Sequence, residues 1–168
     1  MADYTFNTEV GQTIDRELLI LCLNTGTAES PVWSPLGKRV EDSSADYDWA
    51  KETKQDILGS TYTTMKKPVI TQSFDPCELD KGDAAQQKLW KMMVVDQDAA
   101  ALCALDCLVV HAYAGFGERY DACAIENTSI GGAGGGAIGM PIEVTLGGKR
   151  TKGAATVNKG VVSFTAET

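Results

Sequence analysis

The feature that most limits how this chain can fold is a series of short apolar runs of strand length in its C-terminal half. In residues 104–115 (ALDCLVVHAYAG) the side chains alternate between two faces. One face carries Leu105, Cys107, Val109, His111 and Tyr113, and the other carries Asp106, Leu108, Val110 and Ala112. Alternation with a period of two predicts a β-strand. Residues 119–130, 140–148 and 160–167 predict three more strands, the first of them in a hairpin with 104–115.

The N-terminal half adds further strand-length segments. Residues 16–25 (RELLILCLNT) form a compact apolar run that ends in a turn signal, and residues 67–76 (KPVITQSFDP) alternate as a half-buried strand. Residues 31–36 contain Pro31 and Pro35, which restrict them to a sheet edge. The expected total is six or seven strands, which predicts a mainly β fold.

One segment has the period of a helix. Between Asp80 and Ala99, four apolar side chains fall on one face: Ala85, Leu89, Met92 and Met93. Asp80 or Asp83 is placed to cap its N-terminus. Methionines at this spacing are typical of core packing rather than of a binding stripe.

A long polar segment, residues 37–66, interrupts the pattern. Compact domains rarely contain a connection of this length unless it has a function. Tyr47, Trp49, Ile57, Leu58 and Tyr62 are embedded in it, and disorder alone does not require such side chains. Spaced apolar anchors in a polar segment favour a loop that binds a partner. The alternative is a surface loop with a small cluster of its own.

The overall composition fits one domain covering residues 1–168, with a polar N-terminal arm at residues 1–13. The net charge is −8, which argues against a groove that grips nucleic acid by neutralising its phosphates. The N-terminus lacks the basic and apolar regions of a secretory signal, and five cysteines without a C-x-x-C pair favour reduced thiols in a cytosolic product. No apolar run approaches the ~20 residues of a membrane span.

A glycine run, residues 130–141 (IGGAGGGAIGMP), contains the string G-x-G-x-x-G of dinucleotide-binding loops at Gly134, Gly136 and Gly139. That motif functions only where a helix opens directly after it. Here Pro141 and an alternating strand follow, and no acidic residue lies about 20 positions further on. The run is therefore interpreted as a pliable connection between strands, without a bound nucleotide.

The sequence offers little for catalysis or for metal binding. His111 is the only histidine and lies inside a predicted strand, whereas catalytic groups lie mostly on loops or strand ends. Cys103, Cys107 and His111 would need a helix to converge on a metal ion. The carboxylates of residues 41–56 indicate a solvated face rather than a poised acid–base pair. We therefore expect no enzyme, no cofactor and no metal site.

The order of these elements resembles the major tail protein, or tail tube protein, of long-tailed bacteriophages. The resemblance extends from Glu17 to Phe164. It rests on the acidic–aromatic segment with its DILG step, the strand that follows it, the KGDAAQQKLW helix start, the ERYDACAIENTSIGGAGGGAIGMPIEVTLGG stretch and the terminal GVVSF strand.

The resemblance implies a β-sandwich or barrel flanked by one helix, without the extra C-terminal immunoglobulin-like domain that some relatives carry. It implies subunits that join edge to edge into rings, expected to be hexameric, which stack into a tube that conducts DNA during ejection without binding it specifically. The partners implied are other copies of the chain, a tape-measure protein and a tail-terminator protein, in a virion assembled in the cytoplasm of a bacterial host, with no membrane.

In such an assembly, residues 37–66 reach a neighbouring subunit or ring. The residues then expected at the self-assembly interface are Asp46, Tyr47, Asp48, Trp49, Ile57, Leu58, Gly59 and Tyr62. Non-contractile tails are favoured, and the inner tube of a contractile tail or of a type VI secretion system is an alternative. A rival class is a soluble β-sandwich module that binds a small ligand or glycan and uses the long loop as a lid.

Overall fold

The structure, a computed structural model, describes residues 3–167 and is built mainly of β-strands. Its strands are β1 (Leu19–Asn24), β2 (Trp33–Leu36), β3 (Ala45–Asp48), β4 (Glu52–Gln55), β5 (Thr61–Thr64), β6 (Val69–Phe74), β7 (Leu105–His111), β8 (Phe116–Asn127), β9 (Ile142–Leu146), β10 (Arg150–Asn158) and β11 (Val161–Ala166). The mainly β fold is confirmed, but eleven strands replace the expected six or seven.

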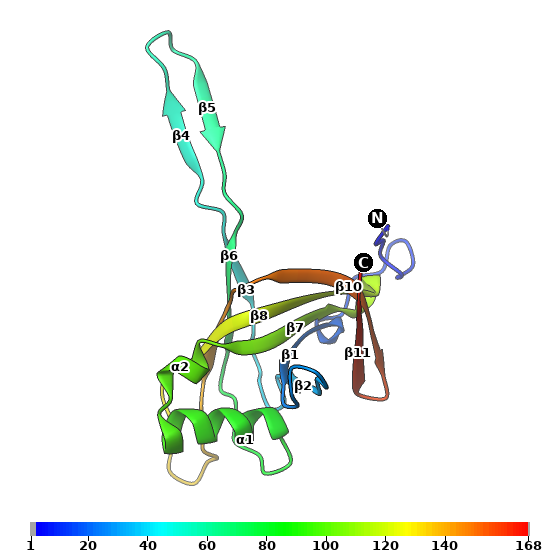
Figure 1. Cartoon of the computed structure of the whole chain (residues 1–168), viewed down its shortest axis with the longest axis vertical. Coiled ribbons are helices and arrows are strands. Elements are labelled where there is room, and N and C mark those ends of the chain that lie inside the picture. The colour runs from blue at the N-terminus through cyan, green and yellow to red at the C-terminus, as the bar shows by residue number, and fades with distance from the viewer. Residues whose placement is uncertain (1–2, 168) are drawn as a thin grey trace.

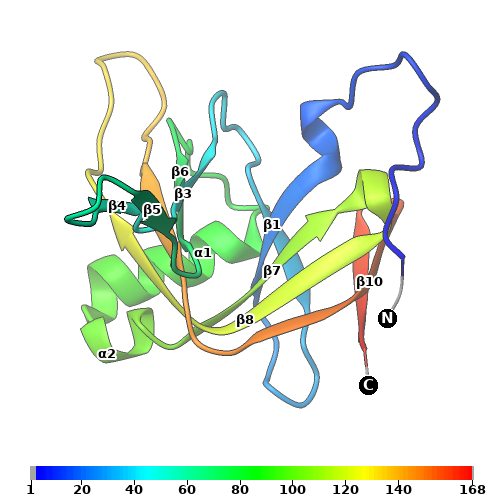
Figure 2. The same ribbon diagram turned by 90° about the horizontal axis from the view of Figure 1, so that it is seen from above.

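Nine of the strands form one curled antiparallel sheet in the order β2-β1-β7-β8-β9-β6-β3 (Figures 1 and 2). The long strand β8 makes the sheet fork. Its first half pairs with β10, which in turn pairs with β11, and its second half pairs with β9. The predicted hairpin of β7 and β8 is confirmed, with its turn at the 3₁₀ helix η3 (Ala112–Ala114) and at Gly115, whose φ of 61° suits glycine.

The helical segment packs on one face of this sheet. It comprises α1 (Ala84–Trp90), which continues as a π-helix, η2 (Lys91–Asp96), and then the short α2 (Ala99–Leu102). Asp83 caps α1 by accepting a hydrogen bond from the Gln86 amide at 3.0 Å. It is one of the two capping residues, Asp80 or Asp83, that the sequence predicted. The single helix predicted to run to Ala99 instead breaks at Gln97, which is left-handed, and Asp98 caps α2.

Two hydrophobic cores lie on opposite faces of the sheet. The larger core includes Leu89 and Met93 of the helical segment, together with the buried residues of β6, β8 and β9. The smaller core is closed by the β10–β11 hairpin, whose Ala155 and Val162 cover the other face of β1 and β7. Strand β7 is therefore buried on both faces, which explains its nearly continuous apolar run.

The N-terminal residues lack regular structure but contact the body. The Tyr4 ring lies 4.6 Å from the Phe116 ring, and the Phe6 ring lies 5.4 Å from that of Tyr113. The Asn7 amide donates to the Tyr113 carbonyl at 2.8 Å. The arm predicted at residues 1–13 therefore contacts the β7–β8 turn through Tyr4, Phe6 and Asn7, whereas Val10 is fully exposed, and residues 1 and 2 lie outside the described residues.

Within residues 3–167, the helices are all too short or too polar to cross a bilayer.

Candidate self-assembly interface

Residues 50–67, here named the projecting hairpin, extend away from the body (Figure 1). They contain β4 and β5, which pair antiparallel with Lys54 opposite Tyr62. Every residue of both strands is exposed. The prediction that residues 37–66 form a loop is therefore wrong, because β3, β4 and β5 all lie within these residues. Alternating threonines, a β-branched residue type that favours strands, explain the local structure.

The tip of the projecting hairpin is an ordered turn. The Asp56 carboxylate accepts hydrogen bonds from the amides of Leu58 and Ser60, each at 2.9 Å. Gly59 has a φ of +84°, a left-handed conformation that glycine adopts without strain. Ile57 and Leu58 are 102% and 87% exposed. The turn therefore presents two adjacent aliphatic side chains to solvent.

The base of the projecting hairpin carries an aromatic pair. The rings of Tyr47, in β3, and Trp49 stack with their centroids 6.3 Å apart. Both are about half exposed, and two neighbouring apolar side chains, Met65 and Val69, are more than half exposed. The Lys66 amide closes the base by donating to the Trp49 carbonyl at 2.9 Å. The result is an apolar patch where the hairpin leaves the sheet.

The residues predicted for self-assembly thus fall into separate groups. Asp46, Tyr47, Asp48 and Trp49 belong to β3 and the base, Ile57, Leu58 and Gly59 form the tip, and Tyr62 lies on β5 between them. The sequence prediction did not include Met65 and Val69. Val69 could have been found from its alternation with Thr71 and Ser73, which places it on the outward face of β6.

Charge is distributed unevenly between the hairpin and the body. The projecting hairpin contains four lysines and two carboxylates, a net charge of +2. Because the whole chain has a net charge of −8, the remaining residues carry −10. The positive excess lies at the base, at Lys51, Lys66 and Lys67, whereas residues 52–65, which include the tip, carry one lysine and two carboxylates.

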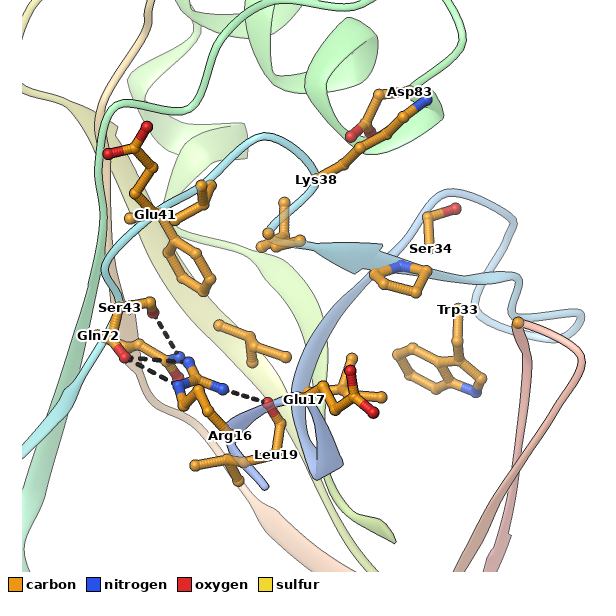
Figure 3. A pocket seen from close by; sticks show the side chains of 18 of the residues that line it. Arg16, Glu17, Leu19, Trp33, Ser34, Lys38, Glu41, Ser43, Gln72 and Asp83 are labelled. Atoms are coloured by element: carbon orange, nitrogen blue, oxygen red, sulfur yellow. Dashed lines mark hydrogen bonds between the residues drawn. The ribbon is translucent and has the colours of Figure 1, made fainter. Parts of the chain in front are cut away.

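An open cavity of about 1020 Å³ lies beside the 3₁₀ helix η1 (Arg16–Leu18), and we name it the η1 cavity. Apolar side chains from four segments line it: Leu19, Leu36, Val40 and Phe74. Arg16 reaches across its edge, as Figure 3 shows, and donates to the Ser43 carbonyl at 3.0 and 3.1 Å and to the Leu19 carbonyl at 2.6 Å. The two bonds to Ser43 join residues 27 apart in the cavity lining.

His111 belongs to a polar network around Glu118, a buried carboxylate. Glu118 Oε1 lies 3.0 Å from His111 Nε2, and Oε2 accepts hydrogen bonds from the Tyr120 hydroxyl and the Arg150 guanidinium. Burial alone would raise the pKa of Glu118, but hydrogen bonds from His111, Arg150 and Tyr120 and the charge of Arg150 lower this pKa to about 2. The histidine therefore helps to hold a structural ion pair inside the sheet.

The glycine run forms a loop that is pinned at its ends. Gly131 and Gly139 exchange backbone hydrogen bonds at 2.7 and 3.0 Å, and the Met140 amide donates to the Cys77 carbonyl. A Cβ on Gly139 would lie 2.7 Å from the Pro76 carbonyl oxygen, so this close approach requires glycine. Strand β9 follows the run, and the helix terminus needed to bind a pyrophosphate does not follow it.

Over residues 3–167, no three His, Cys, Asp or Glu side chains converge in a way that could hold a metal ion. Four of the five cysteines are buried, and Cys103 is exposed. Cys107 and His111 lie in strand β7, and Cys103 follows α2. The three residues therefore do not share the helix that a metal site would have needed.

A solved structure with a similar fold comes from an extracellular contractile injection system. The sheath/tube terminator of the PVC extracellular contractile injection system, in its extended state, matches with a TM-score of 0.50 and 10% identity, over 87% of this chain and 100% of that one. A second match is the PVC sheath–tube complex in its extended state, with a TM-score of 0.47 and 8% identity, over 86% of this chain and 94% of that one. A third is the anti-feeding prophage cap, which terminates the tube, with a TM-score of 0.46 and 14% identity, over 89% of this chain and 96% of that one.

A scan against protein-family models and a search of curated proteins both find no match. The similarity to the PVC terminator concerns the fold: a curled antiparallel half-barrel with one main helix. The predicted fold class, a β-sandwich or barrel of the tail-tube type, is thereby confirmed.

Proposed function

We propose that this chain is a structural subunit that assembles with copies of itself into stacked rings, and so forms part of the tube of a tail-like particle. The observation that carries this proposal is the projecting hairpin. Every residue of its two strands is exposed, its tip and its base are apolar, and it contributes no side chain to either core. A two-stranded hairpin of this kind gains most from contacts with another subunit.

Exposed sheet edges support ring formation. Among residues 3–167, β3 pairs only with β6, and β11 pairs only with β10. Each leaves one row of backbone donors and acceptors free for a strand of a neighbouring copy. Contacts of this kind are heterologous and close into a ring when the rotation between subunits allows it. Six subunits per ring, the number expected from the resemblance to tail tube proteins, is part of the proposal.

The place of the chain within a particle is proposed from the comparison. The whole length of the PVC terminator corresponds to this chain, which supports a tube or tube-terminator position in a contractile injection system. The sequence favoured a non-contractile phage tail and gave the inner tube of a contractile tail or type VI secretion system as an alternative, whereas it placed a terminator only among the partners. Localisation in a virion or prophage-derived particle, and partnership with sheath, tape-measure or terminator proteins, belong to the same proposal.

The inner surface of such a tube is proposed to be the sheet face opposite α1, over β3, β6, β9 and the second half of β8, where the β10–β11 hairpin does not cover it. On this face Glu126 and Glu143 are direct cross-strand neighbours, and Asp46 lies opposite Thr71. Like charges opposite one another destabilise a free sheet slightly, and the same row repels a polyanion that passes along it. An acidic lumen would let DNA or an acidic cargo pass without binding, and the role requires no catalysis.

Electron microscopy of the purified full-length chain tests this function. We expect rings or short tubes in negative stain as the protein concentration rises. A chain that stays monomeric at every concentration, by sedimentation velocity, would contradict the proposal and favour a ligand-binding module. A lumen lined by lysines and arginines in the assembled structure would contradict the proposed inner face.

A further inference from the structure

We propose that Cys107 and Cys123 form a redox pair, whose two thiols are joined into a disulfide between strands β7 and β8 when the folded chain meets a peroxide. The inference is independent of the proposed function, because it concerns a single subunit and needs no second copy. It assigns a role to two buried thiols that the proposed function leaves unused.

Strand register brings the two cysteines to the same face of the sheet. Cys123 lies opposite Leu105, and Cys107 lies opposite Tyr120, so the cysteines are diagonal neighbours across the ladder. Both side chains belong to the larger core and are 0% exposed. The Cys107 thiol donates a hydrogen bond to the Cys123 sulfur, so the two sulfur atoms are already in contact. Bridging them therefore requires a short approach of the sulfurs and no change of strand pairing.

The pair lies beside an irregular point of the sheet. A β-bulge interrupts the β7–β8 ladder, because Asp121 and Ala122 lie opposite the single residue Asp106. Strand β8 pairs with β10 before this bulge and with β9 after it, so the bulge marks the fork of the sheet. A disulfide between Cys107 and Cys123 would therefore join β7 to β8 where the hydrogen-bonded ladder is interrupted.

A small oxidant has a short path to Cys123. Asp121 and Ala122, which precede it in the chain, are exposed. The turn after β9 contacts the bulge through two hydrogen bonds, from the Ala122 amide to the Gly147 carbonyl at 3.3 Å and from the Lys149 amide to the Asp121 carboxylate at 2.7 Å. Local opening of an exposed turn costs less free energy than global unfolding. Peroxide can therefore reach the sulfur while the chain remains folded.

Hydrogen bonds around Cys123 suit a nucleophile. Bonds from the Cys107 thiol and from the backbone amides of Gly147 and Cys107 lower the pKa of Cys123 below its ordinary value, against the opposing effect of burial. The same thiol contact, together with burial, raises the pKa of Cys107. Cys123 is therefore the thiol that deprotonates first, and the thiolate is the reactive form of cysteine.

Hydrogen peroxide supplies the oxidant for the two steps of the reaction. The Cys123 thiolate attacks one peroxide oxygen, so that an S–O bond forms, the O–O bond breaks and hydroxide leaves, and the sulfur becomes a sulfenic acid. Cys107 then loses its proton to this hydroxide, and its sulfur attacks the Cys123 sulfur. The S–S bond forms, the S–O bond breaks, and the second oxygen leaves as hydroxide, which takes up the proton first lost by Cys123. The two thiols lose two electrons, and the peroxide is reduced to two molecules of water.

A released particle would gain stability from this disulfide. A tail-like particle, as proposed above, leaves a cytosol that keeps thiols reduced and meets oxidants outside it. The dithiol form would then fold and assemble, and the disulfide would form afterwards between two central strands of the sheet.

Mass spectrometry of the full-length chain tests the pair. Cys103→Ser removes the exposed thiol and leaves four buried cysteines. The folded, reduced protein is treated with hydrogen peroxide for increasing times, alkylated and digested with trypsin, which cuts after Arg119 between the two cysteines. We expect the disulfide-linked peptides of Cys107 and Cys123 to accumulate at least about tenfold faster than the other two thiols are oxidised.

Cys22 and Cys77 are internal controls of matched burial, at 0% and 2% exposed. Cys22 packs in the smaller core on the opposite face of the sheet, and the Cys77 sulfur accepts a hydrogen bond from the Gln86 side-chain amide at 3.5 Å. Equal rates of oxidation at all four cysteines would show that the reaction follows global unfolding, and would overturn the proposal. A disulfide that joins any other pair would also overturn it.

Single variants in the same Cys103→Ser background assign the two roles. In Cys107→Ser the sulfenic acid at Cys123 has no thiol to condense with, so dimedone should label it. In Cys123→Ser the oxidation of Cys107 should slow at least about tenfold, because the thiolate is lost. Dimedone labelling of Cys107 at the rate seen for Cys123 would contradict the assignment of Cys123 as the nucleophile. Circular dichroism establishes that each variant is folded, and the linked peptides of the Cys103→Ser chain decide the proposal without either variant.

Thermal unfolding measures what the disulfide does. Peroxide treatment of the Cys103→Ser chain should raise its melting temperature by roughly 5 °C, and dithiothreitol should reverse the rise. A melting temperature that stays the same or falls once the linked peptides have formed would contradict a stabilising role. Negative-stain images of the same samples decide the proposed function separately: tubes without the disulfide overturn only the redox pair, and the disulfide without rings or tubes contradicts only the tube.

Discussion

Strand β7 and the strands of the projecting hairpin are both antiparallel, yet they are stabilised in opposite ways. β7 is buried on both faces, between the larger core and the β10–β11 hairpin. β4 and β5 have no buried residue and, within residues 3–167, pair only with each other. Burial of apolar area drives folding of the body, whereas an isolated hairpin in water is marginally stable. This difference is the basis of the proposal that the hairpin serves an encounter with a partner.

Two of the three tryptophans, Trp33 and Trp49, give the largest contrast between these regions. Trp33 is buried in the smaller core with the Arg119 guanidinium 5.8 Å from its ring centroid, and Trp49 lies half exposed at the base of the hairpin. We expect Trp33→Ala to lower the free energy of unfolding by about 3–5 kcal/mol. Trp49→Ala should cost about 1 kcal/mol or less, mainly from the lost stacking on Tyr47, and should weaken assembly.

Urea denaturation of the two variants checks this prediction. Equal destabilisation by both substitutions would place Trp49 in the core and contradict the assignment of the hairpin base to a partner.

Acid should destabilise the fold of the body by protonating Glu118. The pKa of Glu118 is lowered from 4.5 to about 2 in the folded chain, and its side chain is 8% exposed. A carboxyl group with a depressed pKa stabilises the fold above its unfolded pKa, and this contribution is lost as the pH falls from 4.5 towards 2. The shift corresponds to about 3 kcal/mol.

Glu118→Gln should therefore be less stable at neutral pH and should lose this part of the pH dependence. Denaturant unfolding between pH 2 and 7 measures both effects. Glu41→Gln, which alters an exposed carboxylate, is the matched control. An unchanged pH profile in Glu118→Gln would show that the network does not stabilise the body.

Substitutions at the tip should weaken assembly and leave the free energy of unfolding nearly unchanged. Ile57→Ser and Leu58→Ser change exposed side chains, so the free energy of unfolding should stay within about 0.5 kcal/mol of the wild type. Assembly should weaken in both, because a desolvated apolar anchor is lost. Sedimentation velocity and thermal unfolding separate the two effects, and a large fall in melting temperature would show that the tip packs within its own chain.

The smallest expected effect is on the rate of assembly, through electrostatic attraction between copies. Lys54→Glu reverses one charge near the tip and should slow assembly, more strongly at low salt than at high salt, as light scattering would record. Lys152→Glu makes the same change on the exposed side of β10 and serves as the control. Equal slowing by both variants would indicate a general effect of net charge.

The sequence predicted the parts of the fold that bury an alternating apolar face. Ile70 and Phe74 in β6, and Ile142, Val144 and Leu146 in β9, are all buried as their spacing indicates. β10 escaped prediction because the residues that it buries, Gly153 and Ala155, are too small to mark a pattern.

The candidate interface was only partly predictable, for a physical reason. Local sequence revealed the apolar anchors of residues 37–66. Because β4 and β5 have no buried face, their sequences lack the apolar–polar alternation that would predict strands. The η1 cavity is lined by segments that the Arg16–Ser43 hydrogen bond joins across 27 residues, and no local pattern encodes this contact. Whether the eight predicted residues mediate assembly stays a prediction.

The most direct test of the account compares the wild type with a variant in which residues 51–65 are replaced by a short Gly-Ser turn. The account predicts an unchanged melting temperature, because both cores lie outside this segment, and complete loss of rings and tubes in negative stain. A variant that unfolds, or one that still forms tubes, would contradict the claim that the projecting hairpin exists for assembly.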